Sequence, residues 1–279
     1  MGIEFTKWQG CGNDFVLVDD RSESIKDPAE LSRKMCDRHY GIGADGLIII
    51  RPSDKADTRM RIYNTDGSEA EMCGNGIRCF ARWVYELGLV PGEEFTVETG
   101  AGILVPKIIK ENGRITGVRV DMGQPVLDAE KIPTKGFGTG HVVDKTIEVL
   151  GETYHVTCVS MGNPHCVVLW DDLSTLDIEK LGPAFENHPA FPNRVNTEFV
   201  SVRDKNHVRM RVWERGAAVT MACGTGACAT LTACVLNDRT ERKAEIELDG
   251  GKLFIEWSEK DNHIYMTGPA EEVYKGTYI

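Results

Sequence analysis

Two segments of the chain carry the same pattern 150 residues apart, and this internal repeat constrains the fold more than any other feature. Met-Cys-Gly-Asn-Gly-Ile-Arg-Cys begins at Met72, and Ala-Cys-Gly-Thr-Gly-Ala-Cys begins at Ala222. The same offset, without a gap, aligns two further pairs of segments: Arg59–Asn64 with Arg209–Glu214, and Gly12-Asn13 with Gly162-Asn163. A match over this distance predicts two copies of one structural unit.

The sequence pattern of each copy predicts several short strands and one long helix. In the first copy, Ile3–Trp8 and Thr58–Tyr63 have strand patterns, and a helical pattern follows Cys73 to about Leu87. Helices do not alternate regularly with strands, which favours an α+β fold over repeated βαβ units. We therefore expect two pseudo-symmetric, strand-rich domains, each wrapped round a central helix.

Residues 123–140 are rich in Gly and Pro and are the expected linker between the domains. The expected domains are then residues 1–123 and residues 124–267. The second copy has a strand pattern at Val142–Leu150 ahead of its repeat, and the first copy has nothing equivalent before it. We expect a C-terminal strand within residues 268–279 to complete the N-terminal unit.

Both repeated segments place a cysteine at the start of a predicted helix. Cys73 and Cys223 each precede Gly-x-Gly, and unpaired N–H groups at a helix start stabilise a thiolate and lower the pKa of the thiol. Two such groups suit inversion at a carbon, because one removes a proton and the other returns a proton from the opposite face. If the copies pack about an approximate two-fold axis, the helix starts meet in the cleft between the domains, where we expect the active site.

The chemistry expected here needs neither a cofactor nor a metal. The N–H groups of the two helix starts are suited to bind a substrate carboxylate as charge builds on it, and glycines such as Gly74 and Gly224 permit close approach. The GxGxxG match at residues 41–46 precedes a strand, whereas a dinucleotide fingerprint follows one. No two cysteines are spaced as Cys-x-x-Cys, so a zinc ribbon is not supported.

Composition limits the classes of partner that we expect and the cellular compartment in which we expect the protein. The net charge of −11 argues against binding to a nucleic-acid backbone, and no apolar run approaches the length of a membrane span. Nine cysteines without a secretion signal indicate reduced thiols in a cytoplasmic protein. We expect a small-molecule substrate and no nucleic-acid or membrane partner.

The motif set as a whole resembles the diaminopimelate epimerase family over essentially the full length. The resemblance rests on five segments: Gly12-Asn13-Asp14-Phe15, the two cysteine segments, Gly162-Asn163-Pro164-His165 and Glu214-Arg215-Gly216-Ala217. It implies cofactor-independent interconversion of LL- and meso-diaminopimelate, for lysine and peptidoglycan precursors, with Cys73 and Cys223 as the two bases. It also suggests a homodimer.

The substrate-binding residues follow from this resemblance and from the helix starts. They are Asn13, Asn64, Gly74, Asn75, Asn163, Asn196, Glu214, Arg215, Gly224 and Thr225. Diaminopimelate carries a second amino-acid end, which an arginine and a glutamate would bind through its carboxylate and ammonium groups. His165 is a possible accessory residue that lines the cleft.

The chain departs from the family pattern in two places. Part of the family has Gln where this chain has Gly46, and Ala218–Met221 stands where Gly-Glu-Thr-Leu is expected. Both departures concern the positioning of the substrate and leave the proposed bases unchanged.

Other interpretations remain open at this stage. A proline racemase-like enzyme would use the same two thiols on another substrate, although Glu214 and Arg215 favour a substrate with a second zwitterionic end. A thiol redox or sensor protein would instead join Cys73 and Cys223 in a disulfide. The remaining cysteines are expected to be packing residues, as buried cysteines usually are.

Overall fold

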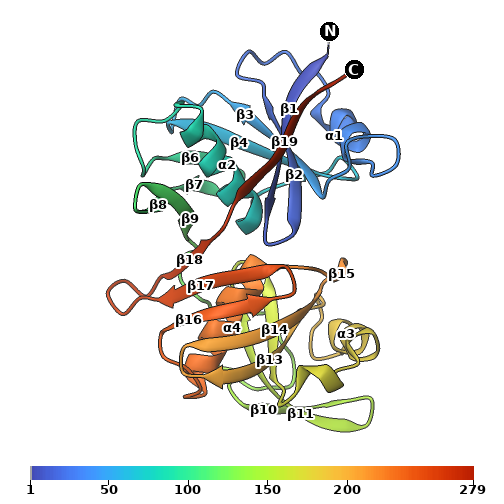
Figure 1. The fold of residues 1–279 in the computed structure, drawn as a ribbon. Coiled ribbons are helices and arrows are strands. Elements are labelled where there is room, and N and C mark those ends of the chain that lie inside the picture. Colours follow the sequence, from blue (N-terminus) through green and yellow to red (C-terminus); the bar gives the residue numbers. More distant parts are fainter. Residues whose placement is uncertain (1) are drawn as a thin grey trace. The chain divides into compact units, whose positions relative to one another are not determined.

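The computed structural model describes residues 2–279, which form two compact units (Figure 1). The first unit runs to Asp121 and includes Thr267–Ile279, and the second is Met122–Met266. Each unit consists mainly of strands and contains one helix of 13 residues. The predicted α+β class is therefore confirmed.

One sheet forms the frame of the first unit. Its strand order is β19-β1-β2-β3-β4-β6-β7, and β5 pairs with β4. The strands are β1 (Ile3–Gly10), β2 (Asn13–Asp19), β3 (Gly46–Arg51), β4 (Thr58–Asn64), β5 (Glu69–Ala70), β6 (Val97–Thr99), β7 (Gly102–Leu104) and β19 (Glu271–Tyr278). The same unit contains the hairpin of β8 (Lys107–Glu111) and β9 (Arg114–Asp121), and the helices α1 (Pro28–Cys36) and α2 (Gly74–Glu86).

Helix α2 is the buried central helix of this unit. Ile77, Phe80 and Val84 recur on one face of the helix and are completely buried. The helix begins after Cys73, which caps it, and it ends before Gly88, whose φ of +68° suits the left-handed conformation that closes many helices. The predicted helix start at Cys73 is confirmed.

The last strand of the chain lies beside the first. β19 pairs antiparallel with β1, with Ile3 opposite Tyr278, and the two strands run side by side in Figure 1. The ring of Phe5 meets the ring of Tyr274 edge-on, with 5.9 Å between centroids. The strand pairing and the ring contact together join segments at opposite ends of the sequence.

The second unit is built on the same plan. Its strands follow the order β10-β11-β12-β13-β14-β16-β17, and β15 pairs with β14. They are β10 (Lys145–Val149), β11 (Glu152–Ser160), β12 (Pro164–Leu169), β13 (Asn196–Asp204), β14 (His207–Glu214), β15 (Ala218–Val219), β16 (Lys243–Leu248) and β17 (Gly251–Trp257). Helix α4 (Gly224–Leu236) is its central helix, and α3 (Ile178–Glu186) and a short 3-10 helix, η1 (Leu173–Thr175), complete it; β18 (Ile264–Gly268) leads back to the first unit.

Strand pairing reproduces the repeat of the sequence. β2 and β3 are parallel with Phe15 opposite Gly46, and β12 and β13 are parallel with His165 opposite Asn196. Each residue of the second pair lies 150 positions after its counterpart in the first. The repeat therefore extends to the register of the strands.

One local expectation was wrong. Residues 123–140 are not a free linker, because Ala129 and Ile132 lie in the core of the second unit and the N–H of Lys135 donates to the carbonyl of Ala190. In the first unit, β7 and β8 are separated at Pro106, which has no N–H group to donate within a sheet.

No helix in the described part of the chain has the length and apolar character needed to cross a membrane.

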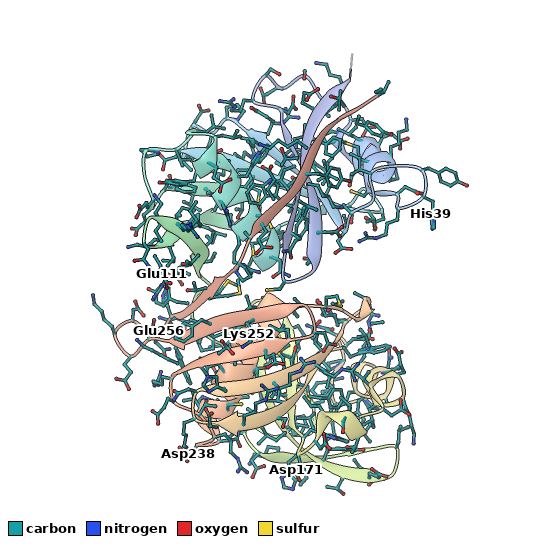
Figure 2. All side chains as sticks on the ribbon, viewed as in Figure 1. His39, Glu111, Asp171, Asp238, Lys252 and Glu256 are labelled. Carbon is teal, nitrogen blue, oxygen red and sulfur yellow. The ribbon has the colours of Figure 1, made fainter. Side chains whose placement is uncertain are left out.

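Charged side chains such as Glu111 in the first unit and Asp238 in the second point outward from the ribbon in Figure 2.

Candidate active site

Cys73 caps the first central helix with its sulfur. Its backbone is extended, with φ −139° and ψ 122°, which turns the side chain toward the open N–H groups of α2. The N–H of Gly76 donates to Sγ at 3.5 Å, and Sγ lies 3.8 Å from Oδ1 of Asn13. The thiol is partly exposed and is held by one donor and one acceptor.

Asn13 presents its amide oxygen to this helix start. Oδ1 accepts from Nδ2 of Asn75 at 3.2 Å, and Nδ2 of Asn13 donates to Asp45 at 2.6 Å. Because a carboxylate only accepts hydrogen bonds, Asp45 fixes which end of the Asn13 amide faces Cys73. Sequence reasoning identified Asn13 but missed Asp45.

Arg78 holds Asn75 in place from beneath. This buried guanidinium donates to Oδ1 of Asn75 at 2.9 Å, to the carbonyl of Gly74 at 3.0 Å and to the carbonyl of Pro269 at 3.2 Å. The amide nitrogen of Asn75 is thereby left to face Asn13. Sequence reasoning did not single out Arg78, because this residue lies within an ordinary helical pattern.

Asn64 is exposed at the end of β4, opposite Gly46. Its Nδ2 donates to the hydroxyl of Ser68 at 3.0 Å. At Gly46 an added Cβ would lie 2.9 Å from the carbonyl of Tyr63, so β3 and β4 approach closely at this position.

Cys223 caps the second central helix in the same manner. Its φ of −120° and ψ of 110° are extended, the N–H of Gly226 donates to Sγ at 3.4 Å, and Oγ1 of Thr225 lies 3.5 Å from Sγ. The predicted helix start at Cys223 is confirmed. Unlike Cys73, this residue is buried, with 5% of its surface exposed.

Carboxylates surround the Cys223 sulfur and oppose its ionisation. Burial, followed by the nearby charges of Glu214 and Glu198, raises the pKa of Cys223 well above its ordinary value of 9.0. The hydrogen bonds from Thr225 and from the Gly226 N–H act in the opposite direction but are weaker. The expected lowering of the thiol pKa by the helix start is therefore wrong for Cys223, because burial outweighs it.

Glu214 lies beside the second cysteine. Its carboxylate accepts from the hydroxyl of Thr220 and hydrogen-bonds with Cys223. Burial raises the pKa of Glu214, and the contacts with Thr220 and Cys223 partly offset this. Thr220 was not among the predicted site residues.

Asn196 uses both ends of its amide on the backbone. Nδ2 donates to the carbonyl of Pro164 at 2.8 Å, and Oδ1 accepts from the N–H of Arg215 at 2.9 Å. The guanidinium of Arg215 is exposed and donates to the carbonyl of Asn193 at 3.0 Å. Asn196 therefore fixes the turn that carries Glu214 and Arg215.

Asn163, just before β12, and His165, within this strand, approach the same helix start. Nδ2 of Asn163 donates to Oγ1 of Thr225 at 3.3 Å, and Oδ1 of Asn163 lies 3.0 Å from Nε2 of His165. The other ring nitrogen, Nδ1, lies 2.6 Å from Oε1 of Glu198. Sequence reasoning missed Glu198, although a carboxylate among the apolar residues of a buried strand was a usable signal.

Most of the predicted residues gather in two half-sites, one at the start of each central helix, whereas the side chain of Asn64 contacts Ser68 and that of Arg215 contacts Asn193. Asn13, Cys73, Gly74 and Asn75 meet at the start of α2. Around the start of α4 the structure gathers Asn163, His165, Glu214, Cys223, Gly224 and Thr225. Among residues 2–279 no group of three or more His, Cys, Asp or Glu side chains is arranged to hold a metal ion.

Known proteins are similar to this chain across nearly its whole length. The family model described as diaminopimelate epimerase matches residues 5–127 and 157–273. A diaminopimelate epimerase of Moorella thermoacetica is 56% identical over 277 residues, covering 99% of both chains. One from Methanococcus maripaludis is 52% identical over 275 residues, covering 98% of this chain and 99% of its own.

Solved structures of lower identity share the fold. A phenazine biosynthesis protein of the PhzF family from Bacillus anthracis has a TM-score of 0.72 at 18% identity, over 100% of this chain and 99% of its own. A hydroxyproline epimerase from Agrobacterium vitis has a TM-score of 0.69 at 15% identity, over 99% and 92%. At these identities the likeness concerns the fold alone.

Proposed function

The chain belongs to the diaminopimelate epimerase family, and on that premise we propose that it interconverts LL- and meso-2,6-diaminopimelate without a cofactor. The reaction serves the formation of lysine and peptidoglycan precursors. The observation that carries the proposal is the matched pair of cysteines, each of which caps the central helix of its own unit.

The inversion uses the two cysteines as two bases. One thiolate takes the proton from the α-carbon, and the other thiol gives its proton to the opposite face of the same carbon. After one turnover the thiolate and the thiol have exchanged roles, so the reverse reaction proceeds by the same steps. We propose that Cys73 and Cys223 are these two bases.

The high pKa of Cys223 assigns it the thiol form in the ligand-free protein. In the direction that begins from this state, Cys73 removes the proton and Cys223 supplies the replacement. The partial exposure of Cys73 and its contact with the Gly76 N–H support this division.

The two helix starts stabilise the negative charge that develops on the substrate. The open N–H groups after Cys73 and Cys223, with the glycines beside them, bind the carboxylate of the reacting end as the α-carbon becomes negative. Asn13 offers an oxygen to the reacting ammonium group, as its orientation toward Cys73 allows. The remaining predicted residues Asn64, Asn75, Asn163, Glu214, Arg215 and Thr225 complete the binding of the substrate, and Asn196 holds the turn that carries Glu214 and Arg215.

We further propose that the enzyme works in the cytoplasm and as a homodimer. A reducing compartment keeps both thiols free, as the mechanism requires. The dimer follows from family resemblance and is tested by light scattering of the purified protein.

The substrate is tested directly with the reduced, folded protein. LL-diaminopimelate and L-proline are incubated separately, and the isomers are separated by chiral chromatography. The proposal predicts meso-diaminopimelate from the first and unchanged L-proline from the second. Racemisation of proline would favour a proline racemase-like enzyme, and absence of meso-diaminopimelate would refute the proposed substrate.

A further inference from the structure

We propose that Glu198 is a positioning residue of the second half-site: it holds the ring of His165, and through it sets the direction of the Asn163 side-chain amide beside Cys223. Only the kinetic part of this inference rests on the proposed function. The rest concerns the hydrogen bonds within one unit.

Glu198 is a carboxylate in the interior of the second unit. It lies on β13 with none of its surface exposed, and its Oε1 is 2.6 Å from Nδ1 of His165, which is also completely buried. Its Oε2 has no hydrogen-bond partner among the described residues. A buried carboxylate is costly unless a donor or a positive charge accompanies it, and His165 supplies this.

The two partners of His165 determine where its protons lie. The carboxylate of Glu198 only accepts hydrogen bonds, so Nδ1 carries a proton. On the other side of the ring, Nε2 faces Oδ1 of Asn163, which also only accepts. With Oδ1 of Asn163 on this side of the ring, both nitrogens donate, and in this proposal the ring carries the positive charge that balances Glu198.

This arrangement fixes Asn163. With Oδ1 turned to His165, Nδ2 is left to donate to Oγ1 of Thr225, which lies 3.5 Å from the sulfur of Cys223. A continuous set of hydrogen-bonding groups thus connects the buried carboxylate to the proposed base.

The first unit lacks this support and orients its asparagine the other way. The counterparts of His165 and Glu198, 150 residues earlier, are Phe15 and Ile48. There Asp45 binds the nitrogen of Asn13, so the oxygen faces the helix start. The pair of Glu198 and His165 therefore makes the two repeated half-sites chemically different: an amide oxygen lies beside Cys73, and an amide nitrogen points toward the start of α4.

The position of Glu198 also explains why residue 226 is a glycine. An added Cβ at Gly226 would lie 2.7 Å from Oε1 of Glu198. The carboxylate thus approaches the first turn of α4 so closely that a side chain at residue 226 would displace it.

The test begins with the unmodified protein. Nitrogen NMR of histidine-labelled, reduced protein at neutral pH, with His165 assigned by a His165→Gln variant, should show two protonated ring nitrogens for His165. A ring nitrogen with a free lone pair would overturn the proposal. This readout requires no catalytic activity, so it separates the inference from the proposed function.

The Glu198→Gln variant tests the effect on the site. The neutral side chain accepts from Nδ1 but no longer balances a charge, so His165 should lose the proton on Nε2 and Asn163 should reverse its amide. We expect kcat/KM for LL-diaminopimelate to fall about 10- to 100-fold, which corresponds to the loss of one charge-assisted hydrogen bond. Unchanged ring-nitrogen signals and an unchanged kcat/KM would each contradict the proposal.

Two controls separate positioning from a general effect on the fold. Thr197→Val alters the preceding buried residue of β13, whose hydroxyl has no partner among the described residues, and should leave kcat/KM within about twofold. In a His165→Gln background, Glu198→Gln should add no further loss, because Glu198 acts through His165. If the two substitutions instead lowered kcat/KM independently, so that their factors multiplied in the double variant, Glu198 would not act through His165.

Discussion

Ala218 adopts a backbone conformation that costs energy for any residue with a Cβ. Its φ is +60°, in the left-handed region, at the point where the chain departs from the Gly expected of the family. We expect Ala218→Gly to stabilise the second unit by about 0.5–1 kcal/mol, because glycine adopts this conformation without the steric cost. Urea unfolding measures the change; a loss of stability would contradict this account of the departure.

At the scale of the residue, sequence reasoning found the groups at the two helix starts and missed those that support them. Cys73, Cys223 and Asn13 stood in repeated motifs, so their matched positions were predictable. Glu198, Asp45 and Arg78 act across long stretches of chain or from within ordinary strand and helix patterns, and their partners follow only from the fold.

At the scale of the element, the start of each central helix depends on glycine. A Cβ at Gly226 would meet Oε1 of Glu198 at 2.7 Å and Sγ of Cys223 at 3.2 Å. Gly226→Ala should therefore destabilise the second unit by about 1–3 kcal/mol, as overpacking does in other cores, and should lower activity. Gly92→Ala, where the added Cβ meets nothing within 4 Å, is the matched control; equal effects of the two substitutions would refute the prediction.

The strand β19 carries a second prediction at this scale. We propose that it completes the first unit, and its pairing with β1 and the contact of Tyr274 with Phe5 support this. A chain that ends at Ala270 should lose protection of the β1 amides in hydrogen exchange, because one edge of the sheet is then open. Amides of β11 and β12 in the second unit serve as the internal control. Undiminished protection in β1 would contradict the proposal.

The elements themselves were largely predictable, because the repeat supplied each pattern twice. Phe15 and His165 begin corresponding strand pairs in register, and both cysteines begin helices. Residues 123–140 were misinterpreted because Gly and Pro mark irregular backbone, and irregular backbone can still pack into a core, as Ile132 does.

At the scale of the whole molecule, buried thiols make the folded state sensitive to alkali. Burial raises the pKa of Cys79 and of Cys234 to about 12 from an ordinary value of 9.0. Below about pH 9 both states keep these protons; above it the unfolded chain loses them first, so the free energy of unfolding falls as pH rises toward 12.

Each such thiol makes the free energy of unfolding fall by about 1.4 kcal/mol per pH unit in this window. Cys79→Ala should therefore flatten the decline between pH 9.5 and 11 by up to that amount, beside a pH-independent loss from the altered packing. Urea unfolding at several pH values measures both, and an unchanged slope would contradict the shift at Cys79.

The central claim is that two different thiols handle the proton on the two faces of the substrate. The most direct measurement is the early time course of LL-diaminopimelate in heavy water, with deuterium at the α-carbon determined separately in substrate and product. Two bases predict meso-diaminopimelate that carries solvent deuterium while the remaining LL isomer carries almost none, because the group that removes the proton is not the one that returns it. Deuterium appearing equally fast in the remaining substrate and in the product, or product that retains the original proton, would contradict the account.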